Sequence, residues 1–479
     1  MTSISSPGIG SGLDVNSIIT QLMAIERRPL DMLVAKSSSI QAQISEYGKL
    51  KSAMSALRDA SLKLSDASTW GASTGTSSDS ASVGVIVESG AAVGRYSVEV
   101  QALARAQSLA SGVYASSAAL PGAGMLRIET GTWGPGQASF TPGATAAVDI
   151  AIEATDTLAQ VRDKINAAGA GVTATILTDA SGSRLMLQSS ATGAANAFRT
   201  TVTDDDGNNA DAAGLSAFAF DPSAGAGVMT QALAAADAAA TFNGLAITSA
   251  SNTLTDLIDG VTLTLGKVTT APVEIGVAQD NEALKGDVQA FVDAYNALAK
   301  LIGGQVKYDA TSKTSGPLQG DSAAVGIQRQ LRALVGTSSG ASSVFTRLSD
   351  VGLELQKDGS LAVDAGKLDA ALAKLPEMKK FFANDDLLVP ANDGIARQFR
   401  ALGDAMLSVD GVITTRSDGL AKRIEMNEDQ QASLEVRLAQ TEQRLRAQYT
   451  ALDTKLGQLS AISAYVSQQM AVFTNSSKS

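Results

Sequence analysis

Apolar residues recur at helical spacing near the amino end of the chain, and this pattern predicts two helices. Asp14 is a suitable N-cap for a short amphipathic helix, which Pro29 interrupts before serving as the first residue of a second helix. The first helix has its apolar positions at Ile18, Ile19, Leu22 and Ile25. In the second helix the apolar positions are spaced mostly by three, four or seven: Leu33, Ile40, Ile44, Tyr47, Leu50, Met54, Leu57 and Leu64. Such a stripe needs a partner helix to cover it.

The carboxyl end supplies a partner. From Leu420 onward, one set of positions seven apart is almost wholly apolar: Ile424, Gln431, Leu438, Leu445, Leu452, Leu459, Val466 and Phe473. The second set is about half polar: Leu420, Asn427, Leu434, Thr441, Gln448, Lys455, Ile462 and Gln469. A coiled coil of roughly 80 Å is therefore predicted, with a seam weak enough to control register or to change partners. The alternative is an ordinary long helix within a globular bundle.

The middle of the chain has the pattern of short strands. Five of the prolines fall between Pro121 and Pro272, among many glycine turns. Alternating residues predict strands at 83–87 and 96–100, joined as a meander, and a hairpin from 172–177 and 185–188 after a helix near 158–165. A third module is predicted to hold a short helix around residues 254–258, an Asp-Gly turn and a strand at 261–265.

Helices return after Asn281. Helical stripes are predicted at 284–302 and from Ile327, followed by a β-hairpin around Asp358-Gly359 and a helix from Ala365 to Phe382. The fold class is therefore multidomain α+β. Terminal helices form a coiled-coil or helical-bundle leg, and two β-rich α+β domains are inserted between the helical halves.

Composition argues against several classes of function. The chain has 479 residues, enough for about three domains, and only 4% are aromatic, which leaves few stacking platforms for sugars or bases. The formal charge of -11 would repel nucleic acids and anionic membranes. No 18-residue apolar stretch and no signal-peptide pattern is present, so we expect neither membrane insertion nor Sec export.

The chain has no cysteine and no histidine. Thiolate nucleophiles, zinc-thiolate sites and Ser-His-Asp triads are therefore excluded. We expect no enzyme activity, no catalytic residue, no metal and no cofactor. The missing cysteine is compatible with either a secreted or a cytosolic protein.

Three motifs could nevertheless carry chemistry. The glycine-rich run 8–12 resembles a phosphate-binding loop, but it lacks the preceding strand and the closing Gly-Lys-Ser/Thr. The acidic turn 204–211 could bind Ca²⁺, although its glycine is misplaced for an EF-hand. The pair Asp385-Asp386 could be a glycosidase pair but has no distant partner. A flexible leader, a solvated turn and a loop are the interpretations that we prefer.

Several sequence runs together resemble the flagellar hook-associated protein 2 family. They occur in the order of that family and cover most of the chain: Gly-Ile-Gly-Ser-Gly-Leu-Asp at 8–14, Leu22-Met23, Glu26–Leu30, Gly94–Val100 with Leu103-Ala104, the module 243–265, Val351-Gly352-Leu353 with Asp358-Gly359, and the carboxyl-terminal coil. The resemblance implies a cap at the distal tip of the bacterial flagellum, which retains exported flagellin and promotes its folding and polymerisation. It further implies four domains: 1–42 with 430–479 as the leg, 43–76 with 280–429 as a helical domain with a β-hairpin, 77–115 with 238–279 as an inner head, and 116–237 as an outer head.

Partners follow from the same resemblance. It implies a homo-oligomeric ring, a pentamer or hexamer, that contacts flagellin and hook-filament junction proteins. A cytosolic export chaperone would cover the carboxyl-terminal coil before secretion through the flagellar type III apparatus, without a cleaved signal peptide. Self-association and filament contact are assigned to the terminal helices, at Ile18, Leu22, Ile25, Leu30, Leu33, Leu434, Leu438, Leu445, Leu452, Leu459, Ile462 and Val466.

The sequence leaves two other functions open. Flagellin or a hook-filament junction protein would also have helical ends around a β insert, although the Leu13-Asp14 and Glu26–Leu30 runs argue against them. Adhesion to host surfaces through residues 83–279 could coexist with capping.

Overall fold

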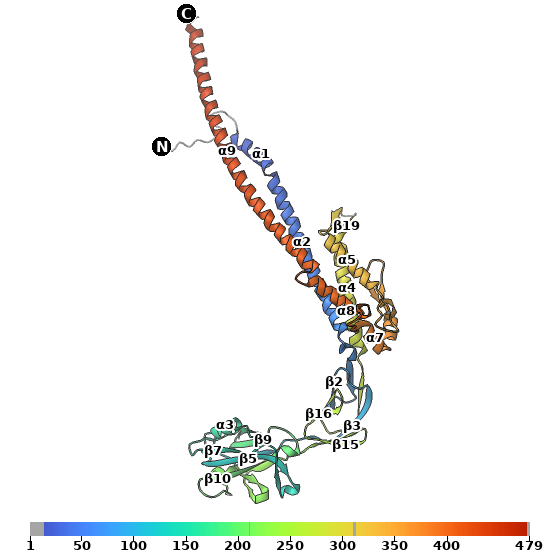
Figure 1. Cartoon of the computed structure of the whole chain (residues 1–479). Helices are drawn as coiled ribbons and strands as arrows, with labels where there is room; N and C mark the ends of the chain where they lie inside the picture. The colour runs from blue at the N-terminus through green and yellow to red at the C-terminus, as the bar shows by residue number, and fades with distance from the viewer. Residues whose placement is uncertain (1–13, 210, 310–312, 477–479) are drawn as a thin grey trace. The chain divides into compact units, whose positions relative to one another are not determined.

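The computed structural model describes residues 14–209, 211–309 and 313–476 (Figure 1). The chain divides into two compact units. The helical unit comprises Met1–Trp70 and Lys285–Ser479, and the strand-rich unit comprises Gly71–Leu284. Each unit has its own buried core, as the following paragraphs show.

Long helices dominate the helical unit. They are α1 (Val15–Glu26), α2 (Arg28–Ser65) and α9 (Val412–Ser476). The Asp14 carboxylate accepts a hydrogen bond from Ser17 N at 3.0 Å, which confirms the predicted cap. The break between the first two helices is also confirmed, but α2 begins at Arg28, so Pro29 is its second residue. α9 has 65 residues and begins eight positions before Leu420, so it is longer than predicted, at roughly 100 Å.

The predicted stripe of α2 is largely confirmed as a buried face. Its buried apolar residues are Ile40, Tyr47, Leu50, Met54, Leu57 and Leu64. These residues lie on the side of α2 that packs along α8 (Ile395–Leu407) and α9. α2 therefore finds its partner helices within its own chain, as an amphipathic helix of this length requires.

Shorter elements complete the helical unit. They are α4 (Asn281–Val306), β19 (Tyr308–Asp309), β20 (Thr314–Ser315), α5 (Ser322–Val335), β21 (Leu353–Leu355), β22 (Leu361–Val363), α6 (Ala365–Leu372) and α7 (Leu375–Ala383). β21 and β22 pair around Asp358-Gly359, which confirms the predicted hairpin. The single helix predicted from Ala365 to Phe382 is wrong. It breaks before α7, where Pro376 cannot donate to the carbonyl four residues earlier.

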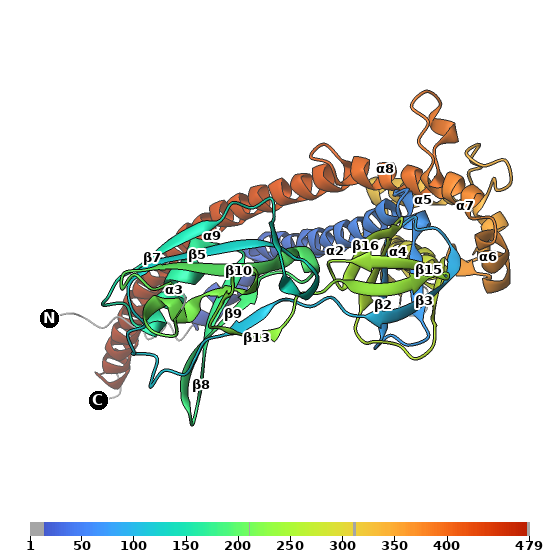
Figure 2. The same ribbon diagram turned by 90° about the horizontal axis from the view of Figure 1, so that it is seen from below.

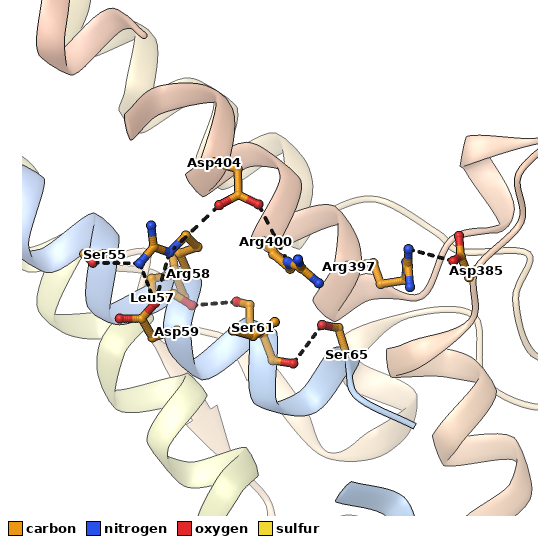
Figure 3. Close-up of polar contacts among 11 residues, drawn as sticks. Ser55, Leu57, Arg58, Asp59, Ser61, Ser65, Asp385, Arg397, Arg400 and Asp404 are labelled. Atoms are coloured by element: carbon orange, nitrogen blue, oxygen red, sulfur yellow. Dashed lines mark hydrogen bonds and ion pairs between the residues drawn. The ribbon is translucent and has the colours of Figure 1, made fainter. Parts of the chain in front are cut away.

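A long ion pair joins α2 to α8 (Figure 3). Arg58 Nη2 lies 2.7 Å from Asp59 Oδ1, and Arg58 Nε lies 3.9 Å from Asp404 Oδ1 across the two helices. A Cβ built on Gly403 would lie only 2.8 Å from Arg58 Cβ. The missing side chain at position 403 therefore sets how closely α8 can approach α2.

The strand-rich unit contains two sheets around an inner core. One has the order β1 (Ser73–Ser77), β18 (Val273–Gln279), β3 (Gly94–Ala102), β14 (Ala238–Phe242) and β15 (Leu245–Ser249). The other has the order β16 (Thr253–Ile258), β17 (Val261–Leu265) and β2 (Val83–Val87). Their shared core includes Val83, Val98, Val100, Leu263 and Ile275.

Two predictions for this region are wrong. β2 and β3 lie in different sheets and do not pair, so they form no meander. The segment predicted as a short helix around Leu254, Leu257 and Ile258 is the strand β16. The apolar residues have a helix-like spacing in the sequence, and the strand accommodates it because its register against β17 shifts between Leu254 and Ile258.

Two further sheets surround an outer core. The first has the order β12 (Ala226–Gly227), β11 (Phe220–Asp221), β10 (Ala197–Asp204), β5 (Gly124–Trp133) and β6 (Phe140–Pro142), with β7 (Val148–Ile152) also paired to β5. The second has the order β13 (Thr230–Leu233), β4 (Ser108–Ala110), β9 (Gly182–Ser189) and β8 (Val172–Asp179). α3 (Leu158–Ala168) begins with a capping box of Thr157 and Gln160. The predicted helix and the β8–β9 hairpin are both confirmed.

The predicted fold class is confirmed: helices occupy both ends of the chain and β-rich α+β structure occupies the middle. The finer division into four domains stays a prediction. Within the described residues, no helix is both long and apolar enough to cross a membrane.

Candidate functional site

α1 packs against α9 through a small apolar core. Val15, Ile19 and Met23 are buried against Leu438. Four half-buried side chains surround them: Leu30, Leu434, Leu445 and Tyr449. Figure 1 shows α1 lying beside α9, with α9 extending well past it. The carboxyl-terminal end of α9 therefore runs on without α1.

The stripe predicted for α1 does not coincide with the face that α9 covers. Of its members only Ile19 is buried, whereas Leu22 is 37% exposed and Ile25 is 59% exposed. Ile18 is half-buried. Apolar residues occupy most of the circumference of this short helix, so spacing alone cannot select the arc that faces a partner. The accessible side chains remain available for contacts with another molecule.

The twelve residues assigned to self-association fall into two groups. Leu438 is buried within the chain, and Ile18, Leu30, Leu33, Leu434 and Leu445 are half-buried. The others are exposed: Leu22, Ile25, Leu452, Leu459, Ile462 and Val466. The first group stabilises the contact of α9 with α1 and α2. Only the second group is exposed enough to contact partners without a change in the packing of α9.

The exposed residues on α9 form part of a longer apolar surface. We call it the distal face of α9, and it consists of Leu452, Leu459, Ile462, Tyr465, Val466 and Met470, exposed by 44–64%. Tyr465 and Met470 were missed in the sequence, although they follow Ile462 and Val466 at helical spacing of three and four. A helix face this apolar is unusual in water unless another surface covers it.

Two further apolar residues are exposed on the first turns of α2. Met32 is 67% exposed and Val34 is 47% exposed. Both were missed because they fall outside the main stripe of α2. They are two residues apart, so they lie on nearly opposite sides of the helix and form no common face.

A buried carboxylate anchors the other end of α9. Asp321 accepts a hydrogen bond from Tyr47 Oη at 2.7 Å and from Arg416 Nε and Nη2 at 2.9 and 2.8 Å. It also caps α5 through Ala323 N and Ala324 N. Burial favours the neutral acid, but these hydrogen bonds outweigh it and hold the pKa of Asp321 below its usual value. α2, α5 and α9 are therefore held together at one point.

The seam between α2 and α9 contains a buried polar position. Asn427 is only 3% exposed and accepts a hydrogen bond from Gln431 Nε2 at 2.5 Å. Its own Nδ2 has no hydrogen-bond partner among the described residues. A buried asparagine fixes the register of a helix pair but lowers its stability. The polar second set of positions in α9 therefore reaches into the packed seam.

Of the three motifs that could carry chemistry, the structure describes two. Residues 8–12 lie outside the described residues. Asp204 accepts hydrogen bonds from Ser216 N and Oγ at 2.8 and 3.0 Å, and so holds its own turn. Asp385 pairs with Arg397 at 2.8 Å, while Asp386 accepts from Leu388 N and Val389 N at 3.0 Å each. Among the described residues no group of three or more acidic side chains is placed to hold a metal ion.

Comparison with known families accounts for most of the chain. Models of the flagellar hook-associated protein 2 N-terminus and C-terminus match residues 11–107 and 235–461. A model of the flagellin hook IN motif matches residues 138–191, which include α3, β8 and β9.

Individual proteins agree with these matches. Flagellar hook-associated protein 2 of Escherichia coli (strain K12) is 32% identical, over 100% of both chains. B-type flagellar hook-associated protein 2 of Pseudomonas aeruginosa is 31% identical, over 93% of both chains. The crystal structure of the flagellar cap protein FliD D1-D2-D3 domains from Escherichia coli is similar with a TM-score of 0.64 and 30% identity, covering 78% of this chain and 99% of that one. Sequence and structure agree along the chain, which belongs to the flagellar hook-associated protein 2 family.

Proposed function

We propose that this protein caps the distal end of the flagellar filament as a self-assembling scaffold. In this role it retains exported flagellin at the growing tip and promotes its folding and polymerisation, so that the filament elongates. The observation that carries the proposal is the distal face of α9. Six apolar side chains, each 44–64% exposed, line one helix beyond the point where α1 covers it.

Self-association through this face follows from its chemistry. Burying a leucine or isoleucine side chain contributes about 1.5–3 kcal/mol, so a row of such residues favours association with a matching helix. Sister chains in a ring of five or six copies offer that helix. Flagellin and the hook-filament junction proteins would meet the same face at the end of the filament.

Reversible contact fits a cap that moves as subunits are added. Lys455 and Gln469 lie at seam positions between the apolar residues of the distal face. Polar residues at such positions weaken a helix pair and permit exchange of partners. A wholly apolar seam would hold each partner more tightly and would slow that movement.

The same face needs cover before export. An exposed apolar stripe self-associates in the cytosol, so a chaperone that binds α9 would keep the chain ready for the flagellar type III apparatus. The mature protein would then lie outside the cell at the flagellar tip. Adhesion by the strand-rich unit stays a prediction, as does the absence of enzyme activity.

Introduction of negative charge on the distal face tests the proposal. Leu459→Glu with Val466→Glu places two carboxylates on the face, whereas the control, Ala464→Glu with Gln468→Glu, places the same charge on the exposed opposite side of α9. We expect the control to assemble as the wild type does and the distal-face variant to stay monomeric in light-scattering measurements. Assembly of both variants alike, or a wild-type chain that is monomeric at high concentration, would refute the proposal.

A further inference from the structure

A second apolar surface lies on the loop between α7 and α8. Leu387 and Leu388 are 92% and 90% exposed, more than any other large apolar side chain of the described residues. Val389 beside them is 45% exposed. We call these three residues the apolar tip. In Figure 2 this orange loop stands out from the helices around it.

Hydrogen bonds hold the apolar tip in one conformation. The Asp386 carboxylate accepts from Leu388 N and Val389 N at 3.0 Å each, and from Asn392 Nδ2 at 2.9 Å. Asn384 Nδ2 closes the base of the loop by donating to Asn392 O at 2.8 Å. The leucines are thus presented to solvent on a fixed backbone. The tip therefore loses little backbone conformational entropy when a partner covers it.

The same unit contains a pocket of about 600 Å³ between α4, α5 and the β21–β22 turn. Its walls include Tyr295, Ala299, Ile302 and Leu331. The hairpin wall is fixed to α4, because Asn296 both donates to Leu361 O at 2.8 Å and accepts from Leu361 N at 2.7 Å. The pocket is therefore preformed, mostly apolar and large enough for leucine side chains.

Charges around the two features are complementary. Lys300, Lys307 and Arg332 lie around the pocket with a single carboxylate, Asp358, so the lining has a net positive charge. None of the three cations forms an ion pair with another described residue. The loop carries three carboxylates, at Asp385, Asp386 and Asp393. Of these, only Asp385 forms an ion pair within the described part of the chain, with Arg397 of the adjoining helix α8. An acidic apolar projection and a basic apolar pocket attract each other and fix their mutual orientation.

We propose that the apolar tip of one subunit inserts into this pocket of the next copy of the chain. Tip and pocket are formed by different segments of the helical unit, and no tip residue lines the pocket of its own chain. The contact is therefore head-to-tail, and repetition of such a contact closes a ring when the rotation between neighbouring subunits is a whole fraction of a turn. This inference rests on the proposed cap function and assigns the contact between neighbouring subunits, whereas the distal face of α9 supplies the longer helical contacts.

Cysteine cross-linking tests the proposed pairing directly, because the chain has no cysteine of its own. One full-length protein carries Leu388→Cys, and the other carries Ala299→Cys at the pocket wall. When the two are mixed and oxidised, we expect a disulfide-linked dimer of one copy of each. A protein with both substitutions should give a ladder that ends at the size of the ring. Val409→Cys is the control for Leu388→Cys, since Val409 is 85% exposed in the connection between α8 and α9 and should give no such product.

Removing the leucines tests whether the contact contributes to assembly. Leu387→Ser with Leu388→Ser should weaken assembly roughly a hundredfold or more, because each of the two leucines buried at an interface contributes about a factor of ten or more. The melting temperature of the dilute monomer should not change, because both side chains are almost fully exposed within the chain. Val409→Ser, which also removes an exposed apolar side chain, should assemble as the wild type does.

The outcomes separate this inference from the proposed function. The tip-and-pocket contact is overturned, and the cap function left standing, if the ring forms equally well with the serine substitutions and the Leu388→Cys and Ala299→Cys proteins give no cross-link. Cross-linking of the Leu388→Cys protein to an added cysteine-substituted flagellin, with none to the Ala299→Cys protein, also overturns it. Failure of the wild-type chain to assemble at all is instead the failure of the proposed function.

Discussion

At the scale of single residues, Asp321 joins three helices of the helical unit through one carboxylate. Its two carboxylate oxygens contact α2 through Tyr47, α9 through Arg416 and the first turn of α5 through backbone N–H groups. The residue is 6% exposed, so loss of its charge leaves the Arg416 guanidinium without its anion and the other donors with a weaker acceptor, in a site that water reaches poorly.

Replacement of this carboxylate should destabilise the helical unit. For Asp321→Asn we expect the free energy of unfolding to fall by about 3 kcal/mol, because a buried, hydrogen-bonded charge pair is broken. Asp404→Asn is the control, since that carboxylate is 53% exposed and its pair with Arg58 spans 3.9 Å; we expect a loss of about 0.5 kcal/mol or less. Urea unfolding followed by circular dichroism measures both, and equal losses would contradict the role of Asp321.

Acid should remove the stabilisation that the ionised Asp321 carboxylate contributes to the folded chain. The pKa of Asp321 lies below its usual value in the folded chain, so its stabilisation is fully present above the pKa of an unfolded aspartate, about 3.9. It is lost as the pH falls below that value and through the folded pKa. The difference in unfolding free energy between wild type and Asp321→Asn should therefore be constant from pH 7 to 5 and shrink below pH 4. A difference that grows in acid would show that another group is responsible.

At the scale of elements, two glycines in helices have opposite surroundings. A Cβ on Gly403 of α8 would meet Arg58 Cβ at 2.8 Å, and the base of an arginine side chain cannot move aside without its helix. Gly419 of α9 has nothing within 4 Å of such a Cβ. The same substitution should therefore have opposite effects at the two positions.

Alanine at these positions tests how closely α8 packs on α2. Gly419→Ala should raise the unfolding free energy by about 0.5–1 kcal/mol, because alanine has the higher helix propensity. Gly403→Ala should lower it by about 1–3 kcal/mol, because overpacking exceeds the same propensity gain. Thermal melts of the two variants beside the wild type check the signs. Stabilisation by both would show that α2 and α8 separate easily.

Sequence patterns predicted the long elements better than the partners of each face. The heptad repeat from Ile424 to Val466 correctly predicted one continuous helix, because each heptad repeats the same pattern of apolar positions. α1 was placed correctly, but its covered face was not, since apolar residues surround the helix. β16 was predicted as a helix because Leu254 and Ile258 are four apart in the sequence, a spacing that the strand accommodates by a shift in register.

The exposed residues of the candidate site could likewise be predicted only in part. Leu452, Leu459, Ile462 and Val466 belong to the repeat, but their exposure depends on where α1 ends along α9, which only the folded chain shows. The leucines at 387 and 388 sat in a correctly predicted loop. Their outward direction is set by the hydrogen bonds of Asp386 and could not be deduced from spacing.

At the scale of the whole molecule, the chain contains two compact units with separate cores, and the surfaces proposed for self-association all lie in the helical unit. Units with separate cores unfold as separate cooperative steps when their interface is small. Association stabilises only the unit that takes part in it, by mass action. Thermal unfolding can therefore locate the assembly surface without any cross-link.

Calorimetry at increasing protein concentration should show two transitions, of which one moves to higher temperature as concentration rises. Asp321→Asn identifies the transition of the helical unit, because it lowers the stability of that unit alone. The concentration-dependent transition should be this one, and Leu459→Glu with Val466→Glu should make it independent of concentration. If the transition that Asp321→Asn leaves unchanged moved with concentration instead, the subunits would associate through their strand-rich units, and the terminal helices would be left free to contact the filament alone.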